Sequence, residues 1–332
     1  MKIPRHMSFL LACLLLFALP ALAAPPRVVV SIKPLHSLVA GVMQGIAEPA
    51  LLVKGGGTPH GYSLRPSEAR LLADADLLVW VGPELESFLA TASRTLSGKA
   101  RQLRLAEQLA GQLLPARAGG DWAEHTDDDD NHGHGQHAHD ADHADDDRHE
   151  HAGDNDPHLW LSPLLAGAIV DQTVAVLSEL DPANQGRYRD NADAVRQRLD
   201  RLHAELRERL TPVREVPYIV FHDAYQYFEQ TYGLNALGSL TISPERKPGA
   251  RRISAIRDRI RVSGARCVFS EPQFEPKLVK TVVTGTGAGT GVLDPLGADL
   301  PAGPEHYFQL LDSLAASLLA GLTPSRQADS AN

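Results

Sequence analysis

Residues 184–210 read NQGRYRDNADAVRQRLDRLHAELRERL, and this segment sets the architecture expected of the chain. Its apolar residues recur at a spacing of three and four, which places them on one face of a helix. They are Tyr188, Ala192, Val195, Leu199, Leu202, Leu206 and Leu210. At about 1.5 Å per residue, such a helix is roughly 40 Å long. A short coiled-coil seam also fits the spacing, but a helix of this length is more simply a rigid connector that packs along two lobes.

The sequence on either side of this helix has the pattern of an α/β protein. Short apolar runs predict buried strands at 28–32, 77–81, 218–221 and 267–269. Stretches with helical periodicity lie between them, for example at 35–43, 67–75 and 254–262. Ser162-Pro163, with serine as N-cap and proline in the first turn, predicts a helix over 164–180. Alternating strands and helices imply parallel sheets with helices on both faces.

The length of the chain points to two lobes. Its 332 residues exceed the usual size of a single hydrophobic core. We expect an N-terminal lobe over 24–183, a linking helix over 184–211 and a C-terminal lobe over 212–332.

The N-terminus has the three parts of a secretory signal: the basic residues Lys2 and Arg5, an apolar run over 7–19, and the small-residue cleavage site Ala21-Leu22-Ala23. The apolar run is short for a membrane span of about 20 residues, so we expect a cleaved signal peptide over 1–23 and an exported protein. Cleavage after Ala23 leaves Cys267 as the only cysteine. It lies in an apolar run and is expected to be a core residue and not a reactive thiol.

A histidine- and aspartate-rich tract occupies 121–156. It holds eight of the 15 histidines of the chain and almost no apolar residues, so it cannot bury enough surface to fold and is expected to be disordered. The histidines are His125, His132, His134, His137, His139, His143, His149 and His151. Several free imidazoles on a flexible loop offer weak, exchanging metal sites. A solvated acidic loop without function is the alternative, but a charged linker does not need eight histidines.

The net charge of −9 belongs to this tract. Aspartate and glutamate dominate it, whereas the remainder of the mature chain is close to neutral. The folded part therefore gives no reason to expect nucleic acid or an anionic membrane as a partner.

Three histidines outside the tract lie in sequence contexts that line clefts. They are His60 in Gly57-Thr58-Pro59-His60-Gly61-Tyr62, His158 in Asp156-Pro157-His158, and His222 in Phe221-His222-Asp223. In open α/β sheets, ligands bind beyond the carboxyl ends of the strands, and His222 ends the run 218–221. Three imidazoles with an open fourth position form a known zinc arrangement. Taken singly, each is more simply explained as a hydrogen-bonded or surface histidine than as a metal ligand.

Four segments resemble the signatures of one known family. They are 58–67 (TPHGYSLRPS), 156–163 (DPHLWLSP), 221–228 (FHDAYQYF) and 292–297 (VLDPLG). In this order, and with a His/Asp-rich insertion before Asp156, the chain resembles the zinc-specific, ZnuA-type solute-binding proteins of ABC transporters. The likeness covers nearly the whole mature chain.

This resemblance implies two α/β lobes joined by one long helix, with Zn(II) as the transported ligand between them. The ligands would be His60, His158 and His222, and Asp294 matches a position that supplies a fourth, carboxylate ligand in several relatives. Related manganese binders have a glutamate at the third position, so His222 favours zinc. Some zinc-binding members have an acidic ligand directly before the first histidine. This chain has Pro59 at that position, which cannot bind metal through its side chain. The fourth ligand could therefore be Asp294 or water. The resemblance also implies a periplasmic location and a membrane permease as the partner, and we expect the protein to be a monomer.

Two other functional classes stay open at this point. A zinc hydrolase would also use three histidines and a metal-bound water, but the sequence lacks a His-Glu-x-x-His helix and has no glutamate within a few residues of the three histidines. A manganese or iron binder, or an adhesin of the same fold, is the second alternative.

The glycine-rich run 285–291 lacks the Gly-Lys-Ser/Thr ending of a phosphate loop and is expected to be a surface turn. Because zinc binds neutral imidazoles, its affinity should fall as the pH drops through about 6.5.

Overall fold

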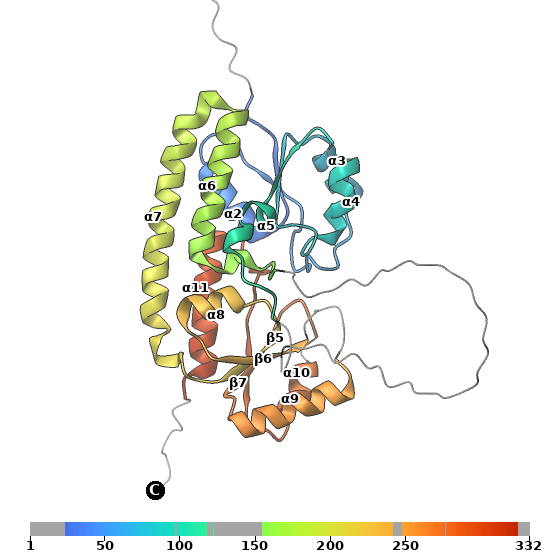
Figure 1. Cartoon of the computed structure of the whole chain (residues 1–332), viewed down its shortest axis with the longest axis vertical. Helices are drawn as coiled ribbons and strands as arrows, with labels where there is room; N and C mark the ends of the chain where they lie inside the picture. Colours follow the sequence, from blue (N-terminus) through green and yellow to red (C-terminus); the bar gives the residue numbers. More distant parts are fainter. Residues whose placement is uncertain are drawn as a thin grey trace, which may run out of the picture.

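The computed structural model describes residues 24–96, 98–117, 122, 155–241, 248–275 and 277–324. These residues form two α/β lobes, and the long helix α7 (Gln185–Arg209) runs along both of them (Figure 1). The predicted signal peptide and the tract 121–156, apart from Trp122, Asn155 and Asp156, lie outside the described residues.

The N-terminal lobe is built around a four-stranded parallel sheet in the order β2-β1-β3-β4. Its strands are β1 (Val28–Val30), β2 (Ala50–Leu51), β3 (Leu77–Trp80) and β4 (Arg101–Arg104). Its helices are α2 (Lys33–Val42), α3 (Pro66–Ala73), α4 (Ser87–Thr95), α5 (Leu105–Gln108) and α6 (Pro163–Leu180), with 3-10 turns η1 (Ala110–Gln112), η3 (Leu159–Leu161) and η4 (Pro182–Asn184). The central strands β1 and β3 are buried along their whole length, as their uninterrupted apolar sequences predict.

The C-terminal lobe repeats this topology with the order β6-β5-β7-β8, again with all strands parallel. Its strands are β5 (Tyr218–His222), β6 (Ala236–Thr241), β7 (Cys267–Ser270) and β8 (Gly289–Val292). Its helices are α8 (Gln226–Tyr232), α9 (Ala250–Ser263), α10 (Lys277–Val283) and α11 (His306–Leu322), with the 3-10 turn η5 (Thr211–Val213) after α7. Both sheets therefore reverse their strand order at the central pair, which is β1 and β3 in one lobe and β5 and β7 in the other.

Helix α7 is the connector that the sequence predicts. Six of the seven residues of its predicted apolar stripe, Tyr188 to Leu206, are buried on the helix, and Leu210 at its C-cap is buried too. They pack against α6 and α2 of the first lobe and α11 of the second, and one apolar cluster runs from Val28 in β1 to Leu322 in α11. Because this core is shared by both lobes, α7 is a connector packed along both and not half of a coiled coil.

Helix α6 begins as the sequence predicts. The Ser162 hydroxyl accepts a hydrogen bond from the Leu165 N–H at 3.3 Å, and Pro163 occupies the first turn. Among the described residues, α6 is the one helix long and apolar enough to cross a bilayer on length and composition. Half of its residues are buried within the protein, which is the pattern of a core helix.

The glycine-rich run 285–291 departs from the prediction of a surface turn. Gly285 and Gly287 have positive φ values and do turn the chain, but residues from Gly289 onward form the edge strand β8. A Cβ at Gly291 would lie 2.6 Å from Cε1 of Phe269, so the strand can approach the core only without a side chain there. Glycine in this strand thus serves close packing as well as turning.

Cys267 is a core residue, as predicted. It is buried in β7, and burial raises the pKa of its thiol to about 12. The thiol is therefore protonated and unreactive at neutral pH.

Candidate metal centre

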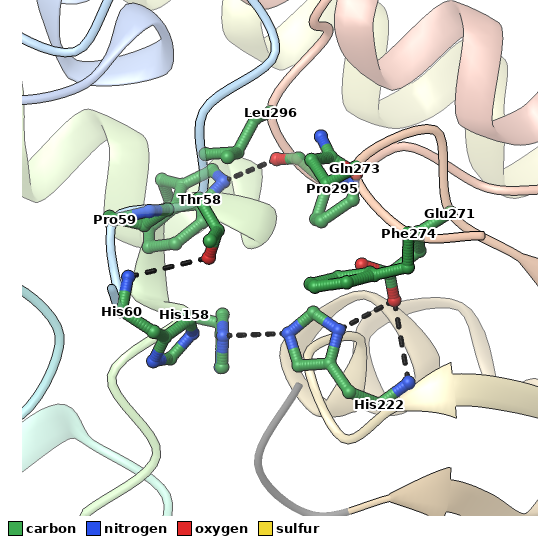
Figure 2. A pocket seen from close by; sticks show the side chains of 11 residues that line it. Thr58, Pro59, His60, His158, His222, Glu271, Gln273, Phe274, Pro295 and Leu296 are labelled. Atoms are coloured by element: carbon green, nitrogen blue, oxygen red, sulfur yellow. Dashed lines mark hydrogen bonds and ion pairs between the residues drawn. The ribbon is translucent and has the colours of Figure 1, made fainter. Parts of the chain in front are cut away.

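The three histidines singled out in the sequence converge from both lobes (Figure 2). His60 lies in the loop between β2 and α3, and His158 lies directly before η3, both in the N-terminal lobe. His222 is the last residue of β5 in the C-terminal lobe. Their rings face one another across the boundary between the lobes, at the place where the sequence predicts a cleft site.

Local structure explains how each ring reaches this place. His222 stands at the carboxyl end of a central strand, next to the point where the strand order reverses, which is the usual ligand position in such sheets. The main chain before His158 is fixed because the Asp156 carboxylate accepts the His158 N–H at 2.9 Å, which closes an Asx turn around Pro157. The loop of His60 turns at Gly55, whose φ of 71° favours glycine.

The spacing of the rings fits a tetrahedral zinc ion. Their centroids are 5.2 to 5.7 Å apart, and one nitrogen from each ring can be chosen so that the three lie within 4.8 Å of one another. The Nε2 atoms of His158 and His222 are 3.4 Å apart. Two nitrogens that each lie about 2.0–2.1 Å from a tetrahedral zinc are also separated by about 3.4 Å.

Carboxylates orient two of the three rings. Nδ1 of His158 lies 2.8 Å from the Asp156 carboxylate, and Nδ1 of His222 lies 2.6 Å from the Glu271 carboxylate. A neutral imidazole has one N–H, so a proton donated from Nδ1 leaves a lone pair on Nε2. When both rings are neutral, both Nε2 atoms present lone pairs to the same gap, and a hydrogen bond between them forms only when one ring carries a second proton.

Burial keeps two of the imidazoles neutral. It lowers the pKa of His60 to about 2, together with the neighbouring charges of His158 and His222 in their protonated forms. Burial, with His222 beside it, likewise holds the pKa of His158 well below its ordinary value. For His222, burial also disfavours the cation, but the Glu271 carboxylate outweighs it and raises the pKa. Neutral imidazole is the form that binds metal, so His60 and His158 are ready ligands at neutral pH.

The cavity between the rings is small and partly apolar. Its volume is about 10 Å³, and Trp160 and Phe274 form part of its wall. The ring of Trp160 lies 5.4 Å from that of His158, and the ring of Phe274 lies 6.4 Å from that of His222. A cavity of this size holds about one water-sized particle. The chemistry available to the arrangement is therefore the binding of a single cation by imidazole nitrogen.

Asp294 is not part of the group that the structure brings together. One of its carboxylate oxygens accepts hydrogen bonds from the Gln273 side chain at 2.9 Å and from the Leu296 N–H at 3.0 Å. The other accepts the Ala298 N–H at 2.5 Å. In this arrangement, the carboxylate holds the loop after β8 in place.

Glu271 is the residue that reasoning from the sequence missed. It is buried, contacts His222 and lies directly after β7, the strand beside β5. His222 was placed by the rule that ligands bind beyond the carboxyl ends of the strands in open α/β sheets. The same rule, applied to the predicted strand 267–269, would have pointed to Glu271 as a neighbour of His222. Asp156 was noticed only as part of a motif, and its contact with His158 required the structure.

The chain matches the profile of a protein family described as zinc-uptake complex component A, periplasmic (ZnuA), over residues 28–321. The high-affinity zinc uptake system protein ZnuA of Brucella abortus (strain 2308) is 46% identical over 305 residues, covering 88% of this chain and 90% of that protein. The protein of the same name from Yersinia pestis is 37% identical over 309 residues, covering 92% and 94%.

Solved structures share the fold. The periplasmic zinc binding protein TroA from Treponema pallidum superposes with a TM-score of 0.73 at 22% identity, covering 90% of this chain and all of that one. A crystal structure of ZnuA gives a TM-score of 0.71 at 24% identity with the same coverage. At these identities the likeness concerns the fold alone. The profile match over most of the chain and the 46% identity nevertheless show, as the sequence motifs suggested, that this chain belongs to the ZnuA family of periplasmic zinc-uptake components.

Proposed function

We propose that this protein captures Zn(II) in the periplasm with His60, His158 and His222 and delivers it to the membrane permease of an ABC importer. The family and the converging triad support this function. Family membership also makes the chain a transport component and not a zinc hydrolase.

One observation carries the zinc assignment. The lone pairs of two Nε2 atoms, 3.4 Å apart, point into one small cavity, and the carboxylates behind them fix both tautomers. Such a pair is electrostatically unfavourable unless a cation lies between the nitrogens. Imidazole suits zinc better than it suits manganese, which prefers carboxylate oxygen, so three imidazoles favour zinc. With Asp294 engaged in its own loop, water is the fourth ligand that we propose.

Delivery would follow from the position of the site between the lobes. A metal bound to groups of both lobes favours the lobe arrangement in which all three imidazoles are at ligand distance. The permease can then distinguish the loaded protein from the empty one by this arrangement. We further propose that the histidine tract raises the local zinc concentration near the site and matters most when zinc is scarce. Equal uptake by cells with and without the tract under chelation would contradict this role.

Calorimetric titration of zinc tests the proposal. The two proteins to compare are the mature chain without residues 125–151, and the same protein with His60, His158 and His222 changed to alanine. We expect one tight site in the first and none in the second. If the first protein has no tight site, zinc binding belongs to the tract and the proposed function is wrong. Competition with manganese and iron on the first protein tests the choice of metal.

A further inference from the structure

Arg117 forms a buried ion-pair cluster that joins the two lobes beside the candidate site. It follows η1 in the N-terminal lobe, and its guanidinium contacts two carboxylates of the C-terminal lobe, Asp223 and Glu229. Nε lies 3.0 Å from both Asp223 oxygens, and Nη1 lies 2.8 Å from Glu229. The carboxylates are only 10% and 5% exposed, so their contacts with the arginine are shielded from water.

The same region holds the base of the histidine tract. Pro115, which precedes the tract, and Asn155, near its C-terminal end, pair as an antiparallel bridge. Trp122 is the one residue within 118–154 that the structure describes. The centroid of its ring lies 3.5 Å from the guanidinium carbon of Arg117. This bridge brings the chain that enters the tract next to the chain that leaves it, and Arg117 lies on the entering segment.

This base is attached to helix α8 of the other lobe. The Tyr227 hydroxyl accepts the Leu114 N–H at 3.1 Å and donates to the Asp156 carbonyl at 2.8 Å. The Gln226 side chain donates to the Pro115 carbonyl at 3.3 Å. In Figure 1 the segment after α5 accordingly descends from the upper lobe to lie beside α8. The chain that enters and leaves the tract is therefore tied to the C-terminal lobe.

The cluster reaches both ligand loops through adjacent residues. Asp223 follows His222 directly in the sequence. The ion pair between Arg117 and Asp223 therefore also limits the movement of His222 at the end of β5. Asp156, whose side chain orients His158, is held through its main chain by Tyr227. Arg117 and α8 together fix the relative positions of one imidazole from each lobe.

We infer that Arg117 is a positioning residue for zinc, which holds His222 at ligand distance from His158 before the metal arrives by anchoring the base of the histidine tract to the His222 loop. This inference rests on the proposed function and assigns a role that neither the triad nor its carboxylates fill. Preorganisation of this kind strengthens binding because fewer groups must be ordered when the ion arrives. Arg117 itself stays outside the coordination sphere, since a guanidinium has no lone pair to offer a metal.

The chain offers a matched control in Arg198. This residue on α7 also pairs with a carboxylate of the C-terminal lobe, Glu305, at 2.7 Å, and also stacks on an aromatic ring, with Phe308 at 3.8 Å. It joins the connecting helix α7 to the C-terminal lobe and is more exposed than Arg117, and none of its described contacts involves a residue of the candidate site. The general effect of losing an arginine–carboxylate pair should therefore appear in Arg198→Gln, whereas loss of ligand positioning should appear only in Arg117 variants.

The test measures zinc dissociation constants and release rates on the full mature chain, loaded with one equivalent of zinc and challenged with a chelator. We expect Arg117→Gln to bind zinc about 10 to 100 times more weakly, the range found when groups that orient metal ligands are lost, and to release it faster. Arg117→Lys should lie between this variant and the wild type, and Arg198→Gln should stay within about twofold of the wild type. The absorption spectrum of the Co(II)-loaded protein should change in Arg117→Gln and not in Arg198→Gln, which reports ligand geometry directly.

A double variant shows whether the effect passes through Asp223. Arg117→Gln with Asp223→Asn should bind zinc no more weakly than Arg117→Gln alone, since both changes break the same contact. Arg117→Gln leaves two buried carboxylates unpaired and could fail to fold for that reason. In that case the double variant and Arg117→Lys are measured in its place.

Two results would overturn the inference. One is unchanged zinc affinity and Co(II) spectrum in every folded Arg117 variant, even with a lower melting temperature. The other is an equal loss of affinity in the Arg117 variants and in Arg198→Gln. If the wild-type chain itself shows no tight site in this assay, the proposed function fails, and that outcome is distinct from both.

Discussion

The two lobes place a hydrogen-bonded pair at the same point of the same topology, but only one pair faces the candidate metal site. In the N-terminal lobe, Ser31 follows β1 and donates its hydroxyl proton to Glu86 at 2.5 Å. In the C-terminal lobe, His222 ends β5 and its Nδ1 lies 2.6 Å from Glu271. Each pair connects the end of one central strand with a glutamate that follows the other.

The difference lies in what remains free after the pair has formed. Once Ser31 has donated to Glu86, the same carboxylate is also bound by the N–H groups of Val81 and Gly82, and the pair is enclosed. Imidazole has a second nitrogen, so His222 can hydrogen-bond to Glu271 and still present a lone pair to the cleft. The same strand-end position thus closes one lobe and opens a ligand site in the other.

The largest expected effect comes from removing the imidazole from this arrangement. His222→Ala deletes the one ligand of the triad that the C-terminal lobe supplies, so zinc affinity should fall by more than about 100-fold, beyond the loss expected for an orienting group. Ser31→Ala, at the equivalent point of the other lobe, should leave zinc affinity unchanged. Chelator competition measures both, and melting curves without metal check that the variants are folded. If the two variants bind zinc equally, the assignment of the site to the C-terminal strand end is wrong.

The glutamate of the N-terminal pair predicts a dependence of stability on pH. Burial raises the pKa of Glu86 from 4.5 to about 7, despite its hydrogen bonds from Ser31 and the main chain. A pKa that is higher in the folded state means that folding takes up a proton, so this contribution is complete below pH 4.5 and is lost as the pH rises through about 7. The shift corresponds to roughly 3 kcal/mol of unfolding free energy.

Glu86→Gln isolates this contribution because the amide cannot titrate. The unfolding free energy of the variant minus that of the wild type should rise by roughly 3 kcal/mol from acidic to mildly alkaline pH. Urea unfolding of both metal-free proteins across this range measures the difference. A difference that stays constant with pH would show that the pKa of Glu86 is the same in the folded and unfolded states.

A smaller effect is expected from the glutamate of the C-terminal pair. Glu271→Gln keeps an acceptor for Nδ1 of His222 but removes the negative charge that makes the imidazole a stronger ligand, so zinc affinity should fall about 10- to 100-fold. Glu86→Gln is the matched control and should bind zinc as the wild type does. Calorimetry on both variants settles the comparison. Equal zinc affinities of the two variants would mean that the charge of the Glu271 carboxylate does not affect how strongly His222 binds zinc.

Much of this fold follows from periodicity. The continuous apolar runs predicted the central strands β1, β3, β5 and β7, and the three-four spacing over 184–210 predicted α7 to within one residue at each end. The linking helix expected over 184–211 is two residues too long at its C-terminal end. The edge strands β2, β4, β6 and β8 were not predicted, because they are short, or polar in part, or rich in glycine, and take their form from a neighbouring strand.

The site was predictable only in part. The strand-end rule placed His222, whereas His60 and His158 lie on loops whose direction depends on contacts far away in the sequence. The resemblance to a family placed these two. The cluster of Arg117 with Asp223 and Glu229 could not have been foreseen, since the arginine is more than 100 residues away from both carboxylates and comes from the other lobe. Contacts between lobes leave no periodic signal in the sequence.

The smallest effect is expected at Asp294, the remaining candidate for the fourth ligand. It follows β8 at the C-terminal edge of the sheet, so it too lies near a strand end, but both of its carboxylate oxygens accept hydrogen bonds from its own loop and from Gln273. If those contacts persist when zinc binds, Asp294→Asn should lower zinc affinity by less than about tenfold, below the range for groups that orient ligands. It should lower the unfolding free energy by about 1 kcal/mol through the lost acceptor. Calorimetry and urea unfolding separate these two quantities. A fall in affinity as large as that of His222→Ala would mean that the carboxylate leaves its loop to bind the metal, and the C-terminal lobe would then supply two ligands, as the N-terminal lobe does.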